Sequence, residues 1–312
     1  MSEKNNIKDI RKNKLGATDI VAINLLSPFK TPLDVYLEKV DNIDTVDETN
    51  ENIVLGKCLE KGIAEAFCQI HSYKLSELID EKSRQFIHPE YDFISCMIDY
   101  ICLDESGNFN ILEIKNVTGA VKEPHSHYAA QLKIQMYITG VERGILCYYD
   151  SYGLKHFDFE LDNTKKEVEK MIEKAVEFWN EHIVNKVPPK PVTMEDLGKI
   201  ETENIEMTIE SGMINDGTLE NDIVYWWNQY KEAKKYEGLY KKKSEDAEKR
   251  IVQAIANKLQ NIPSSLIVND GGKKLFKLKK IQARYLDNDK IKEELGDRIE
   301  DFYKLKSFFR LY

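Results

Sequence analysis

Residues 93–115 constrain the fold of this chain more than any other stretch. They contain two β-rich runs, 94–103 and 109–115, separated by the turn-forming sequence Asp-Glu-Ser-Gly-Asn. Two runs of this length that flank a polar turn are typical of a β-hairpin. We therefore predict that this stretch forms two neighbouring antiparallel strands.

Three ionisable residues lie inside this apolar sequence: Asp99, Glu113 and Lys115. Glu113 and Lys115 are two residues apart, so they share one face of their strand. Leu112 and Ile114 belong to the opposite face, where we expect them to pack in a core. A hairpin also allows Asp99 to lie beside Glu113.

Two neighbouring carboxylates repel each other and lose hydration unless a cation joins them. Oxygen ligands with open water positions suit Mg²⁺ or Mn²⁺, and a lysine beside such a cation can orient an activated water. Asp99, Glu113 and Lys115 are thus candidate residues of a metal-dependent hydrolase. The alternative is that Glu113 and Lys115 form a solvated ion pair on an exposed strand.

Composition narrows the class of protein. The chain is 42% hydrophobic and 32% charged, and it has no run of eighteen apolar residues that could span a membrane. The start lacks the apolar region of a secretory signal, so a cytoplasmic location is expected. The five cysteines form no C-x-x-C pair and lie in apolar surroundings, which predicts reduced core residues. A Walker-type phosphate loop is absent, which excludes an ATP motor of that type.

Charge is unevenly distributed along the chain, whose formal net charge is −9. Residues 191–230 contain nine acids and one base, net −8, whereas residues 231–280 contain fourteen bases and six acids, net +8. An acidic protein can therefore carry a local basic surface. We expect this basic region to contact DNA or a partner protein, or else to pack on the rest of the chain.

Near the start, Arg11 precedes Gly16 and Thr18, which in turn precede an apolar run. Thr18 is predicted to be the N-cap of a short helix. Free N–H groups at a helix start, together with an arginine, suit a phosphate group. The alternative is a plain helix cap with a surface arginine.

Three further polar residues lie beside apolar helical stripes. Glu60 borders the stripe of a helix predicted over 50–75, either as a boundary residue or as a third acid of the metal site. Gln131 and Gln135 lie four residues apart in a helix predicted over 125–140. They are either exposed or directed into a site, where they would contact substrate or the attacking water.

Periodicity and turn residues predict the remaining elements. Strands are expected at 84–91, 144–149 and 154–161, a helix follows at 162–187, and prolines then end this part of the chain. We divide the chain into residues 1–191, an acidic connector at 192–218, and a C-terminal part at 219–312. The C-terminal part is predicted to contain one long basic helical arm, a hairpin and a terminal helix, at 219–260, 264–286 and 289–305.

Several motifs follow one another in a specific order. They are Arg11-x-x-x-Leu-Gly-Ala-Thr18-Asp, Leu26-Ser-Pro-Phe-Lys-Thr-Pro-Leu-Asp-Val-Tyr-Leu-Glu-Lys, Gly56-Lys-Cys-Leu-Glu60, His88-Pro-Glu-Tyr, Ile98-Asp99, Leu112-Glu113-Ile-Lys115 and Tyr128-Ala-Ala-Gln131-Leu-Lys-Ile-Gln135. Over residues 11–190 this order resembles the YqaJ-type viral recombinases, which are phage alkaline exonucleases related to the lambda exonuclease within the PD-(D/E)xK nuclease superfamily. The resemblance implies an α/β (α+β) fold of restriction-endonuclease type, with a central mixed β-sheet flanked by helices.

The resemblance also implies roles for individual residues. Asp99, Glu113 and the main-chain carbonyl of Ile114 would bind Mg²⁺, and Glu60 would be an additional acid. Lys115 would activate or orient the water, and Gln131 would help to place water or substrate. Arg11 and Thr18 would hold the 5′-phosphate of the DNA end. The family often has a small hydroxyl residue, proline and glycine where this chain has Met97, Ile98 and Tyr100.

At the level of activity, the resemblance implies a Mg²⁺-dependent 5′→3′ exonuclease on linear double-stranded DNA. Such enzymes form homotrimers and pass the remaining 3′ strand to a single-strand annealing protein during phage recombination. Three alternatives remain: a CRISPR-associated nuclease, which would carry iron–sulfur cysteines, an endonuclease, and a DNA-end-binding scaffold without catalysis. The paired acids argue against the scaffold, because a binding protein has no use for them.

Overall fold

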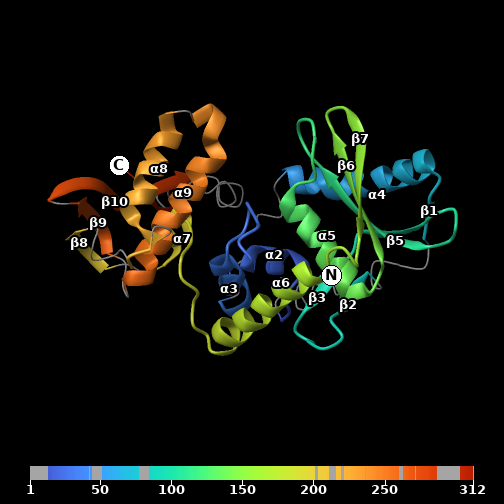
Figure 1. Cartoon of the computed structure of the whole chain (residues 1–312), viewed down its shortest axis with the longest axis horizontal. Coiled ribbons are helices and arrows are strands. Elements are labelled where there is room, and N and C mark those ends of the chain that lie inside the picture. Colours follow the sequence, from blue (N-terminus) through green and yellow to red (C-terminus); the bar gives the residue numbers. More distant parts are fainter. Residues whose placement is uncertain are drawn as a thin grey trace, which may run out of the picture. The chain divides into compact units, whose positions relative to one another are not determined.

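The computed structural model describes residues 13–41, 43, 51–76, 84–200, 203–210, 216–218, 221–235, 237–259, 263–270, 272–286 and 303–311. The chain divides into two compact units, residues 1–188 and 189–312 (Figure 1). The predicted 192–218 connector instead contains a helix and a strand of the second unit, α7 (Met194–Lys199) and β8 (Glu203–Glu210). The acidic composition of this stretch favoured a connector, although its apolar residues Met194 and Leu197 belong to the core of the second unit.

The first unit begins with short helices, α2 (Ala17–Ile23) and α3 (Pro32–Val40), followed by the long helix α4 (Glu51–His71). Helix α3 starts as predicted: Thr31 caps it by accepting a hydrogen bond from the N–H of Asp34 at 3.2 Å. Pro32 occupies the first helical position, where its missing N–H costs nothing.

The central sheet of this unit has five strands in the order β1-β4-β5-β6-β7. Their bounds are β1 (Lys74–Leu75), β4 (Tyr100–Leu103), β5 (Phe109–Asn116), β6 (Arg143–Asp150) and β7 (Gly153–Glu160). Neighbouring strands are antiparallel except β5 and β6, which are parallel and are connected through α5 (Ser126–Thr139). The predicted mixed sheet flanked by helices is therefore present.

The predicted first strand of the 93–115 hairpin is two strands. Ser95–Met97 forms β3, which pairs with β2 (Gln85–Ile87) in a separate two-stranded sheet, whereas β4 pairs with β5. The chain thus leaves one sheet and enters another at Ile98 and Asp99. Periodicity could not locate this break, because both halves are apolar β sequence.

Helices cover both faces of the central sheet (Figure 1). Ile63 and Phe67 of α4 pack with Leu112 and Ile114 of β5, which confirms the predicted core face. On the other face α5 approaches β6 so closely that a Cβ at Gly144 would lie 2.6 Å from the sulfur of Met136. A side chain at this position would therefore force Met136 and Leu132 to shift. Side chains that alternate along β5 point to α4 or to α5 in turn.

The first unit ends with α6 (Lys165–Phe178), which continues as a single π-helical stretch, Trp179–Val184. Val168, Met171, Ile172, Ala175 and Phe178 of α6 are buried, as the apolar stripe of the predicted 162–187 helix required. Of the five cysteines, Cys68, Cys96, Cys102 and Cys147 are buried as predicted, but Cys58 is exposed on α4.

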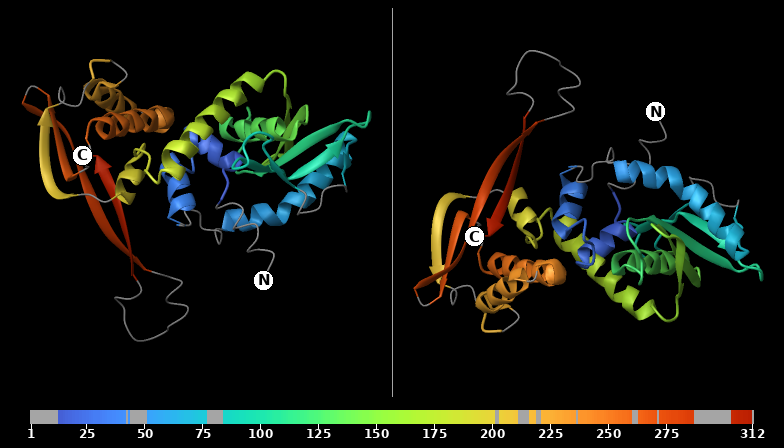
Figure 2. Two further views of the ribbon diagram at one scale, coloured as in Figure 1. Left: turned by 90° about the horizontal axis from the view of Figure 1, so that it is seen from below. Right: turned by 90° about the horizontal axis from the view of Figure 1, so that it is seen from above.

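The second unit contains the four-stranded sheet β11-β10-β9-β8 and a pair of helices. The hairpin of β9 (Pro263–Asp270) and β10 (Lys273–Leu286) confirms the prediction for 264–286, and β11 (Tyr303–Leu311) pairs with β10. The predicted 219–260 helix is two helices that pack on each other, α8 (Ile223–Lys235) and α9 (Glu237–Lys258). In both views of Figure 2 the strands form one layer and these helices lie on one side of it.

The terminal helix predicted over 289–305 is wrong where it can be compared, because Tyr303–Leu305 belong to β11. Residues 289–302 lie outside the described part of the chain. Sequence periodicity alone did not reveal this strand, since its partner β10 supplies its hydrogen bonds from a distant position in the sequence. Among the described residues, no helix is long and apolar enough to cross a bilayer.

Candidate metal and nuclease site

Glu113 is the centre of the site. It lies in the middle of β5, its side chain is fully buried, and it faces α5. Its Oε1 accepts hydrogen bonds from Lys115 Nζ at 2.5 Å and from Gln131 Nε2 at 2.6 Å. Its Oε2 accepts one from Gln135 Nε2 at 2.8 Å. Three protein donors therefore fix a buried carboxylate that would otherwise be costly to desolvate.

Asp99 lies at the break between β3 and β4, where the chain has left one ladder and not yet joined the next. Its Oδ2 accepts a hydrogen bond from the main-chain N–H of Ile114 at 2.9 Å. This bond brings the carboxylate to the strand that carries Glu113, as predicted. Loss of hydration and repulsion by Glu113 raise the pKa of Asp99 well above its usual range, despite the nearby lysine.

The ammonium group of Lys115 donates a hydrogen bond to Glu113. It also lies over the ring of Tyr128, 4.8 Å from the ring centroid. Burial by itself lowers the pKa of Lys115, but the carboxylates of Glu113 and Asp99 outweigh this effect and raise it. The side chain is therefore protonated at neutral pH in this arrangement. It can donate to a charged oxygen but cannot remove a proton until the surrounding negative charge is reduced.

Glu60 of α4 interacts electrostatically with the same group of residues. Burial raises its pKa, Arg84 lowers it, and Glu113 raises it further, so Glu60 is electrostatically part of the site. Its Oε1 lies 3.7 Å from the guanidinium of Arg84, which in turn lies over the ring of Tyr100. The predicted third acid is thus near the site but is held by an arginine.

Gln135 is not accessible to a substrate, in contrast to one of the two predictions for it. Its side chain is completely buried, and its amide nitrogen donates both to Glu113 and to the main-chain oxygen of Met97 at 2.9 Å. It therefore ties β3 to β5 and orients Glu113. Gln131 is partly exposed and remains accessible from the site.

The donor set fits a hard divalent cation. Three acids, Asp99, Glu113 and Glu60, interact with only two bases, Lys115 and Arg84, which leaves an excess of negative charge. Within the described ranges, no three His, Cys, Asp or Glu side chains converge on one point. The carboxylates of Asp99 and Glu113 are a small set of oxygen ligands, and Mg²⁺ suits such a set because it retains waters and binds substrate phosphate oxygens.

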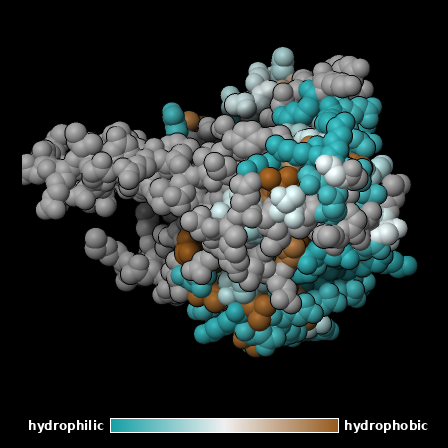
Figure 3. All heavy atoms as spheres, turned by 90° about the vertical axis from the view of Figure 1, so that its left-hand side faces the viewer, coloured by the Kyte–Doolittle hydropathy of each residue, from teal (hydrophilic) through white to brown (hydrophobic). Residues whose placement is uncertain are grey.

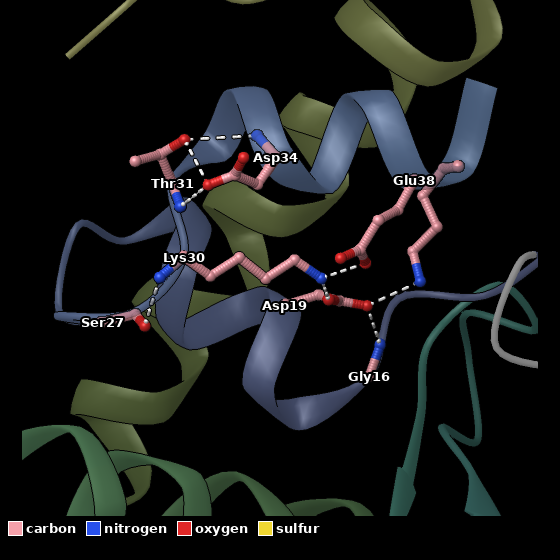
Figure 4. Close-up of polar contacts among 8 residues, drawn as sticks. Gly16, Asp19, Ser27, Lys30, Thr31, Asp34 and Glu38 are labelled. Atoms are coloured by element: carbon pink, nitrogen blue, oxygen red, sulfur yellow. Dashed lines mark hydrogen bonds and ion pairs between the residues drawn. The ribbon is translucent and has the colours of Figure 1, made fainter. Parts of the chain in front are cut away.

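The predicted phosphate-binding start of α2 is only partly described, since Arg11 lies outside the described residues. Thr18 is exposed, but it is the second residue of α2 and not its N-cap, which is Gly16. Asp19 takes the capping role, because its Oδ2 accepts the N–H of Gly16 at 2.9 Å (Figure 4). The spacing Gly-Ala-Thr-Asp did not distinguish Thr18 from Gly16 as the residue before the helix.

A buried ion network fixes this segment (Figure 4). Asp19 pairs with Lys30 at 2.6 Å and with Lys39 at 2.8 Å, and Lys30 also pairs with Glu38. Burial by itself raises the pKa of Asp19, but the two lysines outweigh it and lower the pKa far below its usual range. The network joins α2 to α3, and apart from the charges themselves no sequence pattern predicted it.

The sequence did not predict that residues of α5 surround the ammonium group of Lys115, which belongs to β5. Tyr128 lies under the ammonium group, and the imidazole of His127 packs against Tyr128, with ring centroids 4.0 Å apart. Burial, His125 and Lys115 lower the pKa of His127 to about 4. The signal for these residues was the aromatic and imidazole sequence His-Ser-His-Tyr at 125–128, which two alanines separate from Gln131.

Comparisons with known proteins agree with the motif order. Residues 7–142 match the model of the YqaJ-like viral recombinase domain, which confirms the family resemblance. A Bacillus subtilis (strain 168) protein, YqaJ, is 28% identical over 187 residues, which cover 57% of this chain and 56% of that protein. The chain thus spans about half the length of the curated relative it matches.

Two solved structures are similar in part. An alkaline exonuclease from Laribacter hongkongensis has a TM-score of 0.44 at 17% identity, over 56% of this chain and 93% of that one. A phage-related exonuclease from Haemophilus somnus 129PT has a TM-score of 0.43 at 10% identity, over 58% of this chain and all of that one.

Proposed function

We propose that residues 7–142, which match the YqaJ-like viral recombinase domain, form the core of a nuclease that acts in phage recombination. The proposed reaction is Mg²⁺-dependent hydrolysis of linear double-stranded DNA from its 5′ ends, which leaves a 3′ single strand. Support comes from the domain match and from the arrangement of acids and lysine around Glu113.

The observation that carries this proposal is the fully buried Glu113 beside Asp99. Burying carboxylates costs free energy, and nearby carboxylates repel each other. Here two glutamines and a lysine are used to hold one of them in a fixed position. A protein that only binds DNA gains nothing from this arrangement, whereas a hydrolytic site requires it.

Asp99, Glu113 and the main-chain carbonyl of Ile114 would hold Mg²⁺, and Mn²⁺ could replace it. When bound, such a cation activates water for attack on phosphorus and stabilises charge on the leaving oxygen. The chain itself supplies the protonated Lys115, whose ammonium can donate to a phosphate oxygen or orient the attacking water. Gln131 helps to place that water or the substrate, and Gln135 keeps Glu113 in position.

Further parts of the proposal come from the family resemblance. Arg11 and Thr18 would bind the terminal 5′-phosphate, and Glu60 would assist at the metal site. The protein would act as a homotrimer and would deliver its product strand to a single-strand annealing protein.

Digestion of end-labelled linear duplex, with and without Mg²⁺, tests this function. We expect mononucleotides to be released from the 5′ ends only when Mg²⁺ or Mn²⁺ is present, while covalently closed circular DNA stays intact. Cleavage of closed circles would favour the endonuclease. Binding to linear ends without hydrolysis under any metal condition would favour the non-catalytic scaffold.

A further inference from the structure

The second unit contains a sheet with two different faces. Leu266 and Val268 of β9 and Phe276 and Leu278 of β10 are buried in a core with residues of α7, α8 and α9. The register pairs Phe276 with Val268 and Leu278 with Leu266, so these four residues share one face. The helices of the unit cover this face.

The opposite face is accessible where its side chains are described. Ile267 of β9 is paired with Thr208 of β8 on one side and with Lys277 of β10 on the other. Thr208 is exposed, Ile267, Asn269 and Lys277 are partly exposed, and Pro263 and the small Ser265 are buried. Seen from the side of this unit, hydrophilic residues predominate among the coloured ones and hydrophobic ones form small separate patches (Figure 3).

The two strands at one edge of this sheet are strongly basic. The 14 residues of β10 include six lysines or arginines, the nine residues of β11 include three, and neither strand contains an acid. In a chain of net charge −9 this is a marked local excess of positive charge.

Register decides which face these bases belong to. β10 and β11 pair without interruption, with Lys279 opposite Arg310, Ala283 opposite Lys306 and Tyr285 opposite Lys304. Residues that alternate along a strand belong to the same face, as do directly paired residues of neighbouring strands. The positions on the face that includes Lys277 therefore carry five bases: Lys277, Lys279, Lys304, Lys306 and Arg310.

Aromatic residues occupy two positions of the same face, Tyr285 on β10 and Phe308 on β11, which lies opposite Ile281. Bases for the phosphates and aromatic rings for stacking are the combination used by proteins that bind single strands. In duplex DNA the π-faces are already stacked, and groove reading calls for an inserted helix or ribbon instead of a broad sheet face. The chemistry of this face therefore favours an unpaired strand.

We propose that the β10–β11 face of the second unit is a binding site for single-stranded DNA. The site lies outside the residues matched by the recombinase domain, and it does not require hydrolysis. Contact with phosphates and stacking on bases would make the binding independent of sequence and sensitive to salt.

The test uses the full chain in EDTA and measures the affinity for a fluorescent oligodeoxythymidine strand over a range of salt concentrations. The variant K304Q/K306Q/R310Q removes three charges from the face. Its control, K165Q/K166Q/K174Q, removes three charges from exposed positions of α6 in the first unit. We expect the face variant to weaken binding at least about tenfold at low salt and to reduce the log–log salt slope by roughly 2, since each phosphate contact contributes about 0.7 for a single strand.

A second measurement does not depend on these variants folding normally. The wild-type chain is photo-cross-linked to a strand that contains bromodeoxyuridine, and the linked peptides are mapped. Cross-links within 277–285 and 304–310 support the site. Equal affinities of the face variant and its control, or cross-links confined to the first unit, would each overturn it. Both readouts are obtained without hydrolysis, so they remain valid even where the proposed nuclease activity is absent.

Discussion

The two sheets of this protein differ in where they carry charged residues. The sheet of the first unit buries Glu113 on a covered face and surrounds it with donors from α5 and β5. The sheet of the second unit packs the apolar side chains Leu266, Val268, Phe276 and Leu278 on its covered face, and the register places five bases of β10 and β11 on the other face. A buried charge with fixed donors is suited to chemistry at one point, whereas a row of bases on a broad face is suited to holding a polymer.

Removal of the acids beside β5 should separate the functions of the two sheets most clearly. Glu113→Gln or Asp99→Asn should lower the hydrolysis rate at least about 10³-fold, because each substitution would remove one of the two carboxylates proposed to bind the metal. Affinity for single strands in EDTA should not change, since that property is assigned to the second unit. Digestion of end-labelled duplex measures the first effect, and near wild-type turnover would exclude the proposed metal site.

Within the first unit, buried charges serve two purposes, and stability separates them. Asp19→Asn should destabilise the fold by about 3–5 kcal/mol, because Lys30 and Lys39 would lose their shared partner. Glu113→Gln should destabilise the fold far less, or even stabilise it. The substitution removes the repulsion between the carboxylates of Glu113 and Asp99. Denaturant unfolding of both variants measures the difference, and equal losses would contradict this division.

The ion pairs of Asp19 with Lys30 and Lys39 should make the stability of the fold depend on pH. The folded-state pKa of Asp19 lies below its ordinary value of 3.8, so folding favours the ionised form. The resulting stability is fully present above about pH 4 and is lost as the pH falls through the lowered pKa. The difference in unfolding free energy between wild type and Asp19→Asn should therefore shrink between pH 4 and pH 2. A constant difference over this window would mean that the ion pairs are not formed in solution.

Lys115 should show a smaller effect than the acids. Lys115→Ala should lower the rate about 10²-fold, the usual scale for one positioned electrostatic group. Lys115→Arg keeps the charge and should recover part of this loss if the ammonium acts by donation to a phosphate oxygen. If Lys115→Ala and Lys115→Arg are equally impaired, the geometry of the ammonium matters more than its charge.

The smallest expected effect concerns the DNA end. Arg11→Ala should slow digestion of 5′-phosphorylated duplex about ten- to a hundredfold, since a charge-assisted contact contributes roughly 1.5–3 kcal/mol. The already slower 5′-hydroxyl substrate should hardly change. Both substrates are measured with wild type and variant. Equal losses on both would assign Arg11 to the fold or to internal phosphates.

Patterns of neighbouring residues were sufficient to predict the local features of the first unit. Alternation along residues 109–115 fixed which side of β5 faces the core, and Leu112 and Ile114 are found there. Thr31 and Pro32 fixed the start of α3. These features depend on residues close together in the chain, so the periodicity of strand and helix is sufficient to find them.

Features that depend on partners distant in the sequence could be seen only in the folded chain. Residues 94–103 change sheets at Asp99, Gln135 is buried against Glu113 and Met97, and β11 completes the second sheet by pairing with β10. The backbone of a strand forms its hydrogen bonds with a neighbouring strand, and the sequence of one strand does not indicate which other strand that will be. The face to which the C-terminal bases belong is fixed by the same register, which is why composition showed their excess but not their arrangement.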